Sequence, residues 1–266
     1  MISTKAINSL REALDIQPKE LVSLVGAGGK TTLMFVLARE LCNNIGLVIT
    51  TTTTKIFPPP SSNTTSLLIS REEKEIIDFI YENAGKVGHV TIASESLADC
   101  GKLQGMSPLL VSKLIRLTPV NCIIVEADGA SRRPLKAPNP AVEPLIPQQT
   151  SLVIPVVGID ALGCKLSEET VFRSAIASKL TGLPLGGIVS PETIVTLILH
   201  PSGIITGSPN QARIIPFINK VDLYADLSIA RDLASKILDR SHPRIRRVVL
   251  GQAQLKPPVI EVVFKG

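Results

Sequence analysis

Aromatic residues are scarce in this sequence: its 266 residues include six phenylalanines, two tyrosines and no tryptophan. Proteins that bind single-stranded nucleic acids stack bases on aromatic rings, so this scarcity argues against a nucleic-acid partner. Long hydrophobic runs are also missing, although 44% of the residues are hydrophobic. A membrane span needs roughly 18 or more consecutive apolar residues, whereas the apolar stretches at 152–158 and 194–199 are much shorter. We therefore expect neither a nucleic-acid partner nor a membrane span.

Cysteine pairs with the spacing of a zinc site are missing as well. The four cysteines, Cys42, Cys100, Cys122 and Cys164, lie far apart in the chain, which argues against a structural zinc site. The first residues do not show the charged and then apolar pattern of a signal peptide, so we expect a cytoplasmic protein with reduced thiols. The net charge of +5 favours an anionic small-molecule ligand.

Short aliphatic runs alternate with stretches of helical spacing along the whole chain. The expected strands lie at 20–25, 46–54, 89–94, 121–126, 152–158, 213–218, 244–250 and 259–264. The expected helices lie at 4–14, 33–41, 71–83, 107–117, 168–180, 191–200 and 226–238. This alternation predicts an α/β fold with a doubly wound, mainly parallel sheet and helices on both faces. We expect one domain over 1–266, with a candidate subdomain seam in the loop 129–150.

A glycine-rich segment, here called the glycine loop (26–32, G-A-G-G-K-T-T), joins the first buried strand to a helix. A phosphate-binding loop needs this context, because glycines let backbone amides reach phosphate oxygens and a helix N-terminus favours anions. The predicted nucleotide-binding residues of this loop are Gly26, Gly28, Gly29, Lys30, Thr31 and Thr32. Lys30 is expected to neutralise the β- and γ-phosphates, and Thr31 to offer its hydroxyl to Mg²⁺.

The glycine loop is shorter than the usual G-x-x-x-x-G-K-[ST] pattern, since Leu24 stands where that pattern has its first glycine. The short form resembles the phosphate loop of the Mur-type amide ligases. The alternative is a glycine-rich turn between strand and helix that binds nothing.

A second motif, C-I-I-V-E-A-D-G (122–129), places two carboxylates just after a buried strand. P-loop proteins place an acid that acts on the magnesium side at such a strand end. The E-x-x-G spacing resembles the third motif of those GTPases that use glutamate there, including the nickel-insertion metallochaperones. This likeness implies that Glu126 holds Mg²⁺ through water and that the amide of Gly129 senses the γ-phosphate. Asp128 would orient a water molecule or contact a substrate; the alternative is an ordinary acidic turn.

A third motif, the N-K-V-D segment (219–222), follows another expected strand. It resembles the guanine-recognition motif of GTPases. The likeness implies that Asp222 accepts two hydrogen bonds from guanine, that the stem of Lys220 lies over the base, and that Asn219 helps to select the base. Adenine offers no matching donors, so such a site discriminates through unpaired polar groups.

Three cations, Arg132, Arg133 and Lys136, follow closely after the two carboxylates. Arginine and lysine at this place are able to clamp a phosphate or a second anionic substrate. The alternative is a solvated basic loop with no ligand.

The motifs occur in an order that resembles the YqeC family. The segments that carry the likeness are VGAGGKTT (25–32), TTTTK (51–55), VEADGASRRPLKAP (125–138), VVGIDALG (156–163), HPSG (200–203) and FINKVD (217–222). The resemblance implies a P-loop NTPase-like nucleotide-binding accessory protein in the maturation of a selenium-dependent molybdenum hydroxylase. The expected partners are thus a nucleotide and such a hydroxylase or its cofactor.

Three functions fit these observations. The first is a Mg²⁺-dependent NTPase, using ATP or GTP, in which Lys30, Glu126 and Asp128 form the catalytic group and Thr31 and Glu126 hold the metal. The second is an ATP-dependent phosphotransferase or ligase-like enzyme that acts on a small anionic acceptor. The third is a nucleotide-gated binding module without hydrolysis. The short glycine loop favours ATP and the N-K-V-D segment favours GTP, so the sequence leaves the nucleotide open.

Overall fold

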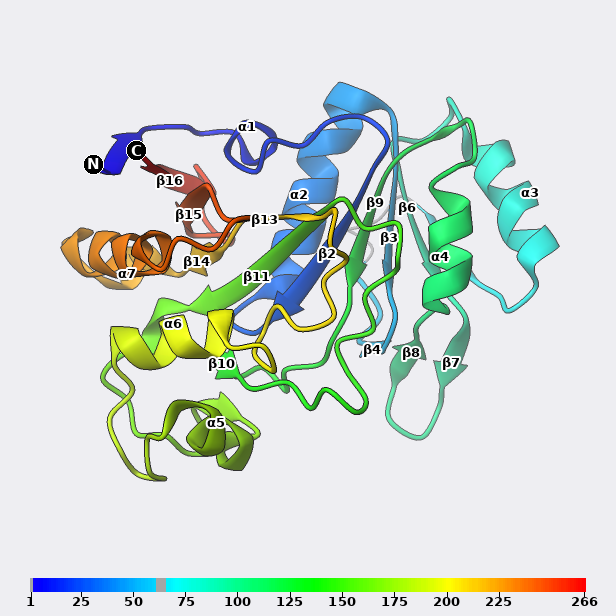
Figure 1. Ribbon diagram of the computed structural model, residues 1–266. Helices are drawn as coiled ribbons and strands as arrows, with labels where there is room; N and C mark the ends of the chain where they lie inside the picture. The colour runs from blue at the N-terminus through cyan, green and yellow to red at the C-terminus, as the bar shows by residue number, and fades with distance from the viewer. Residues whose placement is uncertain (1, 61–65) are drawn as a thin grey trace.

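The computed structural model describes residues 2–60 and 66–266, and Figure 1 shows a large sheet with helices on both faces. The strands of this sheet are β1 (Ile2–Lys5), β2 (Glu20–Gly26), β3 (Leu47–Thr52), β5 (Ser66–Ile69), β6 (His89–Ala93), β9 (Val120–Glu126), β11 (Leu152–Gly158), β13 (Arg213–Ile214), β14 (Phe217–Asn219), β15 (Arg247–Gly251) and β16 (Val259–Lys265). Two small sheets consist of β4 (Lys55–Ile56), β7 (Glu95–Leu97) and β8 (Lys102–Gln104), and of β10 (Leu135–Lys136) and β12 (Val171–Phe172). The helices are α1 (Leu10–Ala13), α2 (Lys30–Ile45), α3 (Glu73–Asn83), α4 (Pro108–Leu114), α5 (Ser174–Thr181), α6 (Pro191–Leu199) and α7 (Ser228–Asp239), with the 3₁₀ turns η1 (Ile159–Ala161) and η2 (Val221–Leu223).

The large sheet has the strand order β1-β16-β15-β14-β11-β2-β9-β3-β6-β5, with β13 beside β11. All pairs from β15 to β5 are parallel, and β16 and β1 add an antiparallel edge. The carboxyl ends of the parallel strands therefore meet at one edge of the sheet. This arrangement brings the ends of β2, β9, β11 and β14 together, which is where ligands bind in open α/β sheets.

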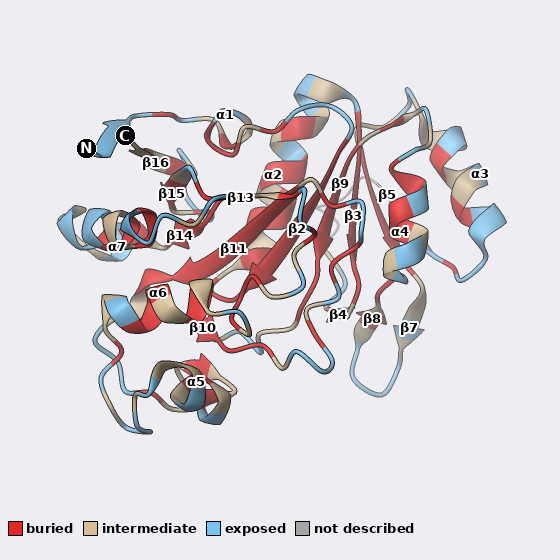
Figure 2. Ribbon diagram, viewed as in Figure 1, coloured by how far each residue is buried: buried red, intermediate tan, exposed pale blue. Residues whose placement is uncertain are grey.

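The central strands are buried on both faces, as Figure 2 shows, because apolar residues occupy consecutive positions. In β2, Leu21 and Val25 pack in a cluster with residues of α3 to α7, whereas Val22 and Leu24 pack with residues of α1 and α2. Burying one such side chain contributes roughly 1.5–3 kcal/mol. The expected mainly parallel sheet with helices on both faces is thus confirmed.

The expected helix at 4–14 is wrong over its first half. Residues 2–5 form the edge strand β1, which pairs with β16, and only Leu10–Ala13 is helical. The helix starts there because the Ser9 hydroxyl accepts a hydrogen bond from the Glu12 amide and the Glu40 carboxylate accepts those from Leu10 and Arg11. The edge pairing depends on a strand about 260 residues away, which a local pattern does not reveal.

Two further expectations need correction. The helix expected at 168–180 begins at Ser174, because the Glu168 carboxylate accepts hydrogen bonds from the amides of Arg173 and Ser174 and closes a turn there. The strand expected at 213–218 is divided into β13 and β14, since Pro216 between them has no amide to donate. Within the described part of the chain, no helix is both long and apolar enough to cross a membrane.

Candidate functional site

The three sequence motifs meet at the carboxyl edge of the large sheet. The glycine loop follows β2, the carboxylates of the second motif follow β9, and the N-K-V-D segment follows β14. Strands β2 and β9 are neighbours, and β11 lies between β2 and β14. Residues nearly 200 positions apart in the sequence are therefore brought together by parallel pairing.

Lys30, which belongs to the glycine loop and is the first residue of α2, is buried and only 3% exposed. Its ammonium donates to the Gly26 carbonyl at 2.5 Å and lies 3.1 Å from Oδ1 of Asp128 and 3.7 Å from Oε1 of Glu126. Burial alone lowers the pKa of Lys30, but the negative charges of Asp128 and Glu126 outweigh it, so that the pKa lies above its usual 10.5. Lys30 is thus fully charged at neutral pH.

The hydroxyl of Thr31 donates to Oε2 of Glu126 at 2.7 Å. This contact joins the first turn of α2 to the end of β9 across 95 positions of sequence. Burial raises the pKa of Glu126 above its usual 4.5, opposed by the charge of Lys30 and the hydrogen bond from Thr31. Thr52, at the end of β3, fixes the same strand end because its hydroxyl donates to the Glu126 carbonyl at 2.8 Å.

Asp128 is 1% exposed and lies between two lysines. Its Oδ1 faces Lys30 at 3.1 Å, and its Oδ2 faces Lys136 at 3.0 Å. The amide of Gly26 also donates to Oδ2 at 3.0 Å. The carboxylate therefore connects the end of β2 with the segment after β9, and it belongs to the frame of the glycine loop.

The glycine loop packs directly on the end of β11. Gly28 has φ +75° and its Cα faces Gly158, so an added Cβ would collide with the backbone of Gly158. The Gly28 amide donates to the Arg133 carbonyl at 2.9 Å, and the Ala27 amide donates to the Val156 carbonyl at 2.9 Å. These two amides are therefore already bonded within the protein. The amides of Lys30, Thr31 and Thr32 begin a helix and have no carbonyl of a preceding turn to bond.

Asn219 is 3% exposed and bridges two loops. Its Nδ2 donates to the Gly28 carbonyl at 2.8 Å, and its Oδ1 accepts from the Ala253 amide at 2.9 Å. A Cβ on Gly29 would press against the same Nδ2, so the glycine is needed there. Asn219 thus fixes the glycine loop to the segment after β15.

Within the rest of the N-K-V-D segment, Val221 is buried in the core, whereas Lys220 is half-buried and Asp222 is exposed. Lys220 has φ +64° and its ammonium lies 2.6 Å from Oδ2 of Asp160, which follows β11. Asp222, in η2, is exposed, and it has no hydrogen-bond or ion-pair partner among residues 2–60 and 66–266. Its carboxylate is accordingly available to a ligand.

The three cations after the acidic motif have different surroundings. Lys136, in β10, is fully buried and bonded to the protein itself, which contradicts a solvated loop at this position. Arg133 is half-buried and its Nε donates to the Glu168 carbonyl at 2.6 Å. Arg132 is exposed and its guanidinium lies 5.2 Å from the centre of the Phe57 ring. Of the three, Arg132 is the one best placed to meet a ligand from solvent.

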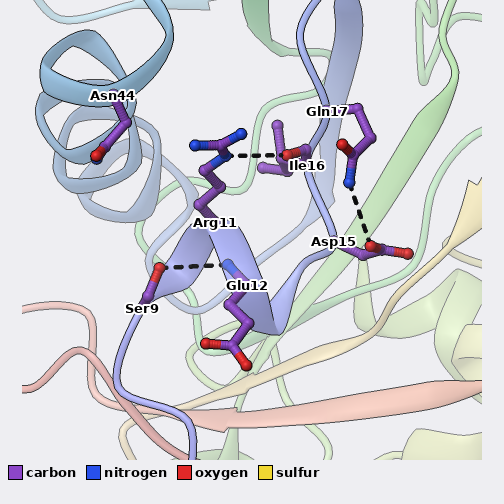
Figure 3. Close-up of a pocket in the computed structure, with 7 residues that line it drawn as sticks. All are labelled: Ser9, Arg11, Glu12, Asp15, Ile16, Gln17 and Asn44. Carbon is purple, nitrogen blue, oxygen red and sulfur yellow. Dashed lines mark hydrogen bonds between the residues drawn. The ribbon is translucent and has the colours of Figure 1, made fainter.

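A separate cavity of about 390 Å³ lies near the start of β2 and the end of α2, at the edge of the sheet opposite to the glycine loop. Figure 3 shows its lining, in which Arg11 bonds the Ile16 carbonyl and Gln17 bonds Asp15. None of the residues expected to carry chemistry lines this cavity.

Comparison with known proteins identifies the family. The family described as YqeC protein matches residues 22–175, which is more than half of the chain and includes the glycine loop and both carboxylates. The chain belongs to the YqeC family. A curated relative, the "Uncharacterized protein YqeC" of Escherichia coli (strain K12), is 34% identical over 243 residues and covers 90% of each chain. Solved structures gave no match to this chain. The family expected from the sequence is thus confirmed.

In this YqeC-family chain, the structure adds residues that the sequence motifs did not reveal. Glu143 accepts hydrogen bonds from Lys136 and, at 2.5 Å, from Arg173. No spacing relates Glu143 to the motifs, since the loop between 129 and 150 must fold back to bring it there. Asp160 could have been found from the sequence, because it follows the buried strand β11 just as Asp128 follows the buried strand β9.

Proposed function

We propose that this protein is a Mg²⁺-dependent nucleotide-binding protein that acts as an NTPase on ATP or GTP. The observation that carries the proposal is the 2.7 Å contact between the Thr31 hydroxyl and the Glu126 carboxylate, beside buried Lys30. A hydroxyl at the start of a helix, a carboxylate at a strand end and a lysine beside them are the groups that P-loop proteins use for nucleotide and metal.

The strand order supports a P-loop NTPase-like arrangement. The strand that leads into the glycine loop, β2, lies directly beside the strand that ends in Glu126, β9. The pairing places Leu24 opposite Glu126, two residues before the loop starts. The glycine loop and the acidic strand end are therefore adjacent, as metal-bridged phosphate binding requires.

In the proposed function, the first turn of α2 binds the phosphates. The amides of Lys30, Thr31 and Thr32 have no hydrogen-bond partner within residues 2–60 and 66–266, and they lie at the N-terminal end of the 16-residue helix α2, whose dipole favours anions. The ammonium of Lys30 leaves the Gly26 carbonyl and donates to phosphate oxygens instead. Both interactions act in a buried setting, where they are stronger than in water.

The donor atoms fit magnesium. Mg²⁺ prefers oxygen ligands, and it keeps several water molecules while using one or two carboxylates together with substrate phosphates. The Thr31 hydroxyl and the Glu126 carboxylate supply two such oxygens, 2.7 Å apart. When bound, Mg²⁺ would neutralise charge that develops on the phosphates.

The base is expected at the other end of the site, above β14. Asn219 is occupied by the Gly28 carbonyl and the Ala253 amide, so it shapes the site from below. The exposed carboxylate of Asp222 is the group able to accept two hydrogen bonds from a guanine edge. This feature favours GTP over ATP.

Hydrolysis is favoured over transfer to an anionic acceptor. The transfer hypothesis needs several cations to hold the acceptor, whereas Lys136 is buried in ion pairs and Arg133 bonds a carbonyl, which leaves Arg132 alone of the three exposed to a ligand. Asp128 lies close to Lys30 and would help to hold the phosphate end of the site. Slow turnover would instead favour the third hypothesis, the nucleotide-gated binding module.

Within the cell, we propose that nucleotide binding serves the maturation of a selenium-dependent molybdenum hydroxylase. Family membership supports this proposal through the resemblance described above. Disrupting the gene in an organism that has such a hydroxylase should abolish the hydroxylase activity while leaving the amount of hydroxylase polypeptide unchanged. Normal activity in the disrupted strain would contradict this role.

Release of phosphate from ATP or GTP by the purified protein tests the hydrolysis directly. We expect Mg²⁺-dependent release without an added acceptor, and loss of release in Glu126→Gln. Glu192→Gln, which changes an exposed glutamate on α6, is the control and should behave as the unchanged protein. Release that needs no Mg²⁺, or that persists in Glu126→Gln, would contradict the assigned role of Glu126.

A further inference from the structure

Lys136 is a fully buried lysine whose ammonium is held by three acceptors. It lies 3.0 Å from Oδ2 of Asp128, it donates to the Gly129 carbonyl at 2.6 Å, and it donates to the carboxylate of Glu143. A lysine ammonium has three N–H donors. Two of them are donated to Gly129 and Glu143, and the ammonium also pairs with the carboxylate of Asp128, so the partners of Lys136 all lie inside the protein.

Asp128 is shared between Lys136 and Lys30. The two lysines lie on different oxygens of the same carboxylate, Lys30 at 3.1 Å from Oδ1 and Lys136 at 3.0 Å from Oδ2. The Gly26 amide adds a hydrogen bond to Oδ2 at 3.0 Å. Apart from the ion pair with Lys30, Oδ1 has no hydrogen-bond partner within the described residues.

Nucleotide binding changes this balance. Under the proposed function, Lys30 must turn from the Gly26 carbonyl and Asp128 toward phosphate oxygens. A buried carboxylate that loses its counter-ion is strongly unfavourable in a protein interior. Because Lys136 stays on Oδ2, Asp128 keeps one positive partner when Lys30 leaves.

We propose that Lys136 is a positioning residue that serves as the second counter-ion of Asp128, so that Lys30 is free to leave Asp128 and bind the phosphates. The proposal rests on the proposed function and concerns the same site. It assigns to Lys136 a role through Asp128 and excludes direct contact between Lys136 and the nucleotide.

The surroundings of Lys136 keep it in place during this exchange. Glu143 accepts from Lys136 and, at 2.5 Å, from Arg173 at the start of α5. Phe172 lies opposite Lys136 in the neighbouring strand β12, and the centre of its ring is 5.7 Å from the Lys136 ammonium. Because Arg173 bonds the same Oε1 of Glu143 and holds it in place, Lys136 is not drawn toward the phosphates together with Lys30.

The first test measures the affinity of Mg²⁺-ATP and Mg²⁺-GTP by calorimetry for four proteins: the unchanged chain, Lys136→Met, Asp128→Asn and the double variant. We expect about tenfold weaker binding in Lys136→Met, which corresponds to about 1.4 kcal/mol, because Lys30 is then the sole positive partner of Asp128. The double variant should regain the affinity to within about threefold, because no carboxylate at position 128 retains Lys30. Lys236→Met, which changes a partly exposed lysine on α7, is the control and should bind as the unchanged chain.

The outcomes separate this proposal from the proposed function. No binding by the unchanged chain overturns both. Binding by the unchanged chain together with equal affinity in folded Lys136→Met, or with no recovery in the double variant, overturns the role of Lys136 alone. A purely structural role would lower the free energy of unfolding of Lys136→Met without the recovery of affinity.

A second measurement tests the proposal even if Lys136→Met fails to fold. It is a crystal structure of the unchanged chain with Mg²⁺ and a non-hydrolysable analogue of the nucleotide that binds. We expect Lys136 still bonded to Asp128, with Lys30 moved to the phosphates. A structure in which Lys136 contacts the nucleotide, or in which Lys30 remains on Asp128, overturns the proposal.

Discussion

The two ends of the candidate site are built in different ways. At the phosphate end, Lys30, Asp128 and Lys136 are buried and hold one another through charge. At the base end, Lys220 and Asp222 are partly or fully exposed, and the loop that carries them is fixed by the buried side chain of Asn219. Folding therefore fixes the side chains at the phosphate end, whereas at the base end it fixes the backbone and leaves the carboxylate of Asp222 to the ligand. Changes at the two ends should affect different properties.

The largest effect should come from removing the charge that the two buried lysines share. Asp128→Asn leaves Lys30 and Lys136 with one carboxylate fewer, and breaking a buried ion pair costs about 3–5 kcal/mol. We expect the free energy of unfolding, measured in urea, to fall by this amount. Asp232→Asn removes an exposed carboxylate paired with Lys236 and should change it by less than about 1 kcal/mol. Equal effects of the two substitutions would contradict the distinction between buried and exposed charge.

A substitution between the two ends should have a smaller effect. Gly28→Ala adds a Cβ that collides with the backbone of Gly158, so we expect a loss of about 2–3 kcal/mol in the free energy of unfolding together with weaker nucleotide binding. Gly163 has nearly the same φ but open space around it, so that Gly163→Ala should cost only about 1 kcal/mol. If Gly163→Ala lowers the free energy of unfolding as much as Gly28→Ala does, the close contact between the glycine loop and β11 is not the cause of the loss in Gly28→Ala.

A change at the base end should alter selectivity alone. We expect Asp222→Asn to reduce the preference for GTP over ATP about tenfold, or about 1.4 kcal/mol, with no change in the free energy of unfolding. Competition between the two nucleotides measures this ratio. Asp239→Asn, at the end of α7, is the matched exposed control. An ATP preference that is indifferent to Asp222 would remove the guanine assignment and leave the phosphate end unaffected.

The smallest effect concerns pH. Because burial raises the pKa of Glu126, the folded protein binds more protons than the unfolded chain between pH 4.5 and that raised pKa. The contribution of Glu126 to stability therefore falls as pH rises through this window, by about 1.4 kcal/mol for each pKa unit of the shift. Unfolding in urea at a series of pH values should show this fall in the unchanged chain.

Glu126→Gln is the variant that isolates this group. It has no carboxyl group at position 126 to titrate, so its stability should depend less on pH in the same window. The same fall in Glu126→Gln as in the unchanged chain would contradict the raised pKa of Glu126.

The residues of the phosphate end could be located from the sequence, but the ion pairs and hydrogen bonds among them could not be predicted. Short aliphatic runs and glycines are local features of the sequence. They predicted that Lys30 lies at the start of a helix and that Glu126 lies at the end of a strand. The pairing of Lys136 with Asp128 and Glu143 depends on how the segment between residues 129 and 150 folds back over the sheet edge. No periodic pattern in the sequence indicates how that segment folds. The sequence therefore left two interpretations of Lys136 open, a contact to a ligand and a position in a solvated loop.

The edges of the fold were hard to predict for a similar reason. Strand β1 exists because it pairs with β16 at the far end of the chain, and the helical spacing that predicted a helix at 4–14 does not reveal this pairing. Central strands such as β9 and β11 have continuous apolar runs that predict them by themselves. Prediction thus succeeded for strands that are buried on both faces, because their apolar residues are consecutive in the sequence. It failed for strands that form only because they pair with a distant segment.

The most direct test of the central claim is calorimetric titration of the protein and of Lys30→Ala with ATP and with GTP, each with and without Mg²⁺. The account predicts binding that is tighter with Mg²⁺, and a loss of about 100-fold or more in affinity, about 2.7 kcal/mol, in Lys30→Ala. Circular dichroism should show that the variant stays folded, since Asp128 retains Lys136. Unchanged affinity in a folded Lys30→Ala variant, or no binding of either nucleotide by the unchanged protein, would contradict the account.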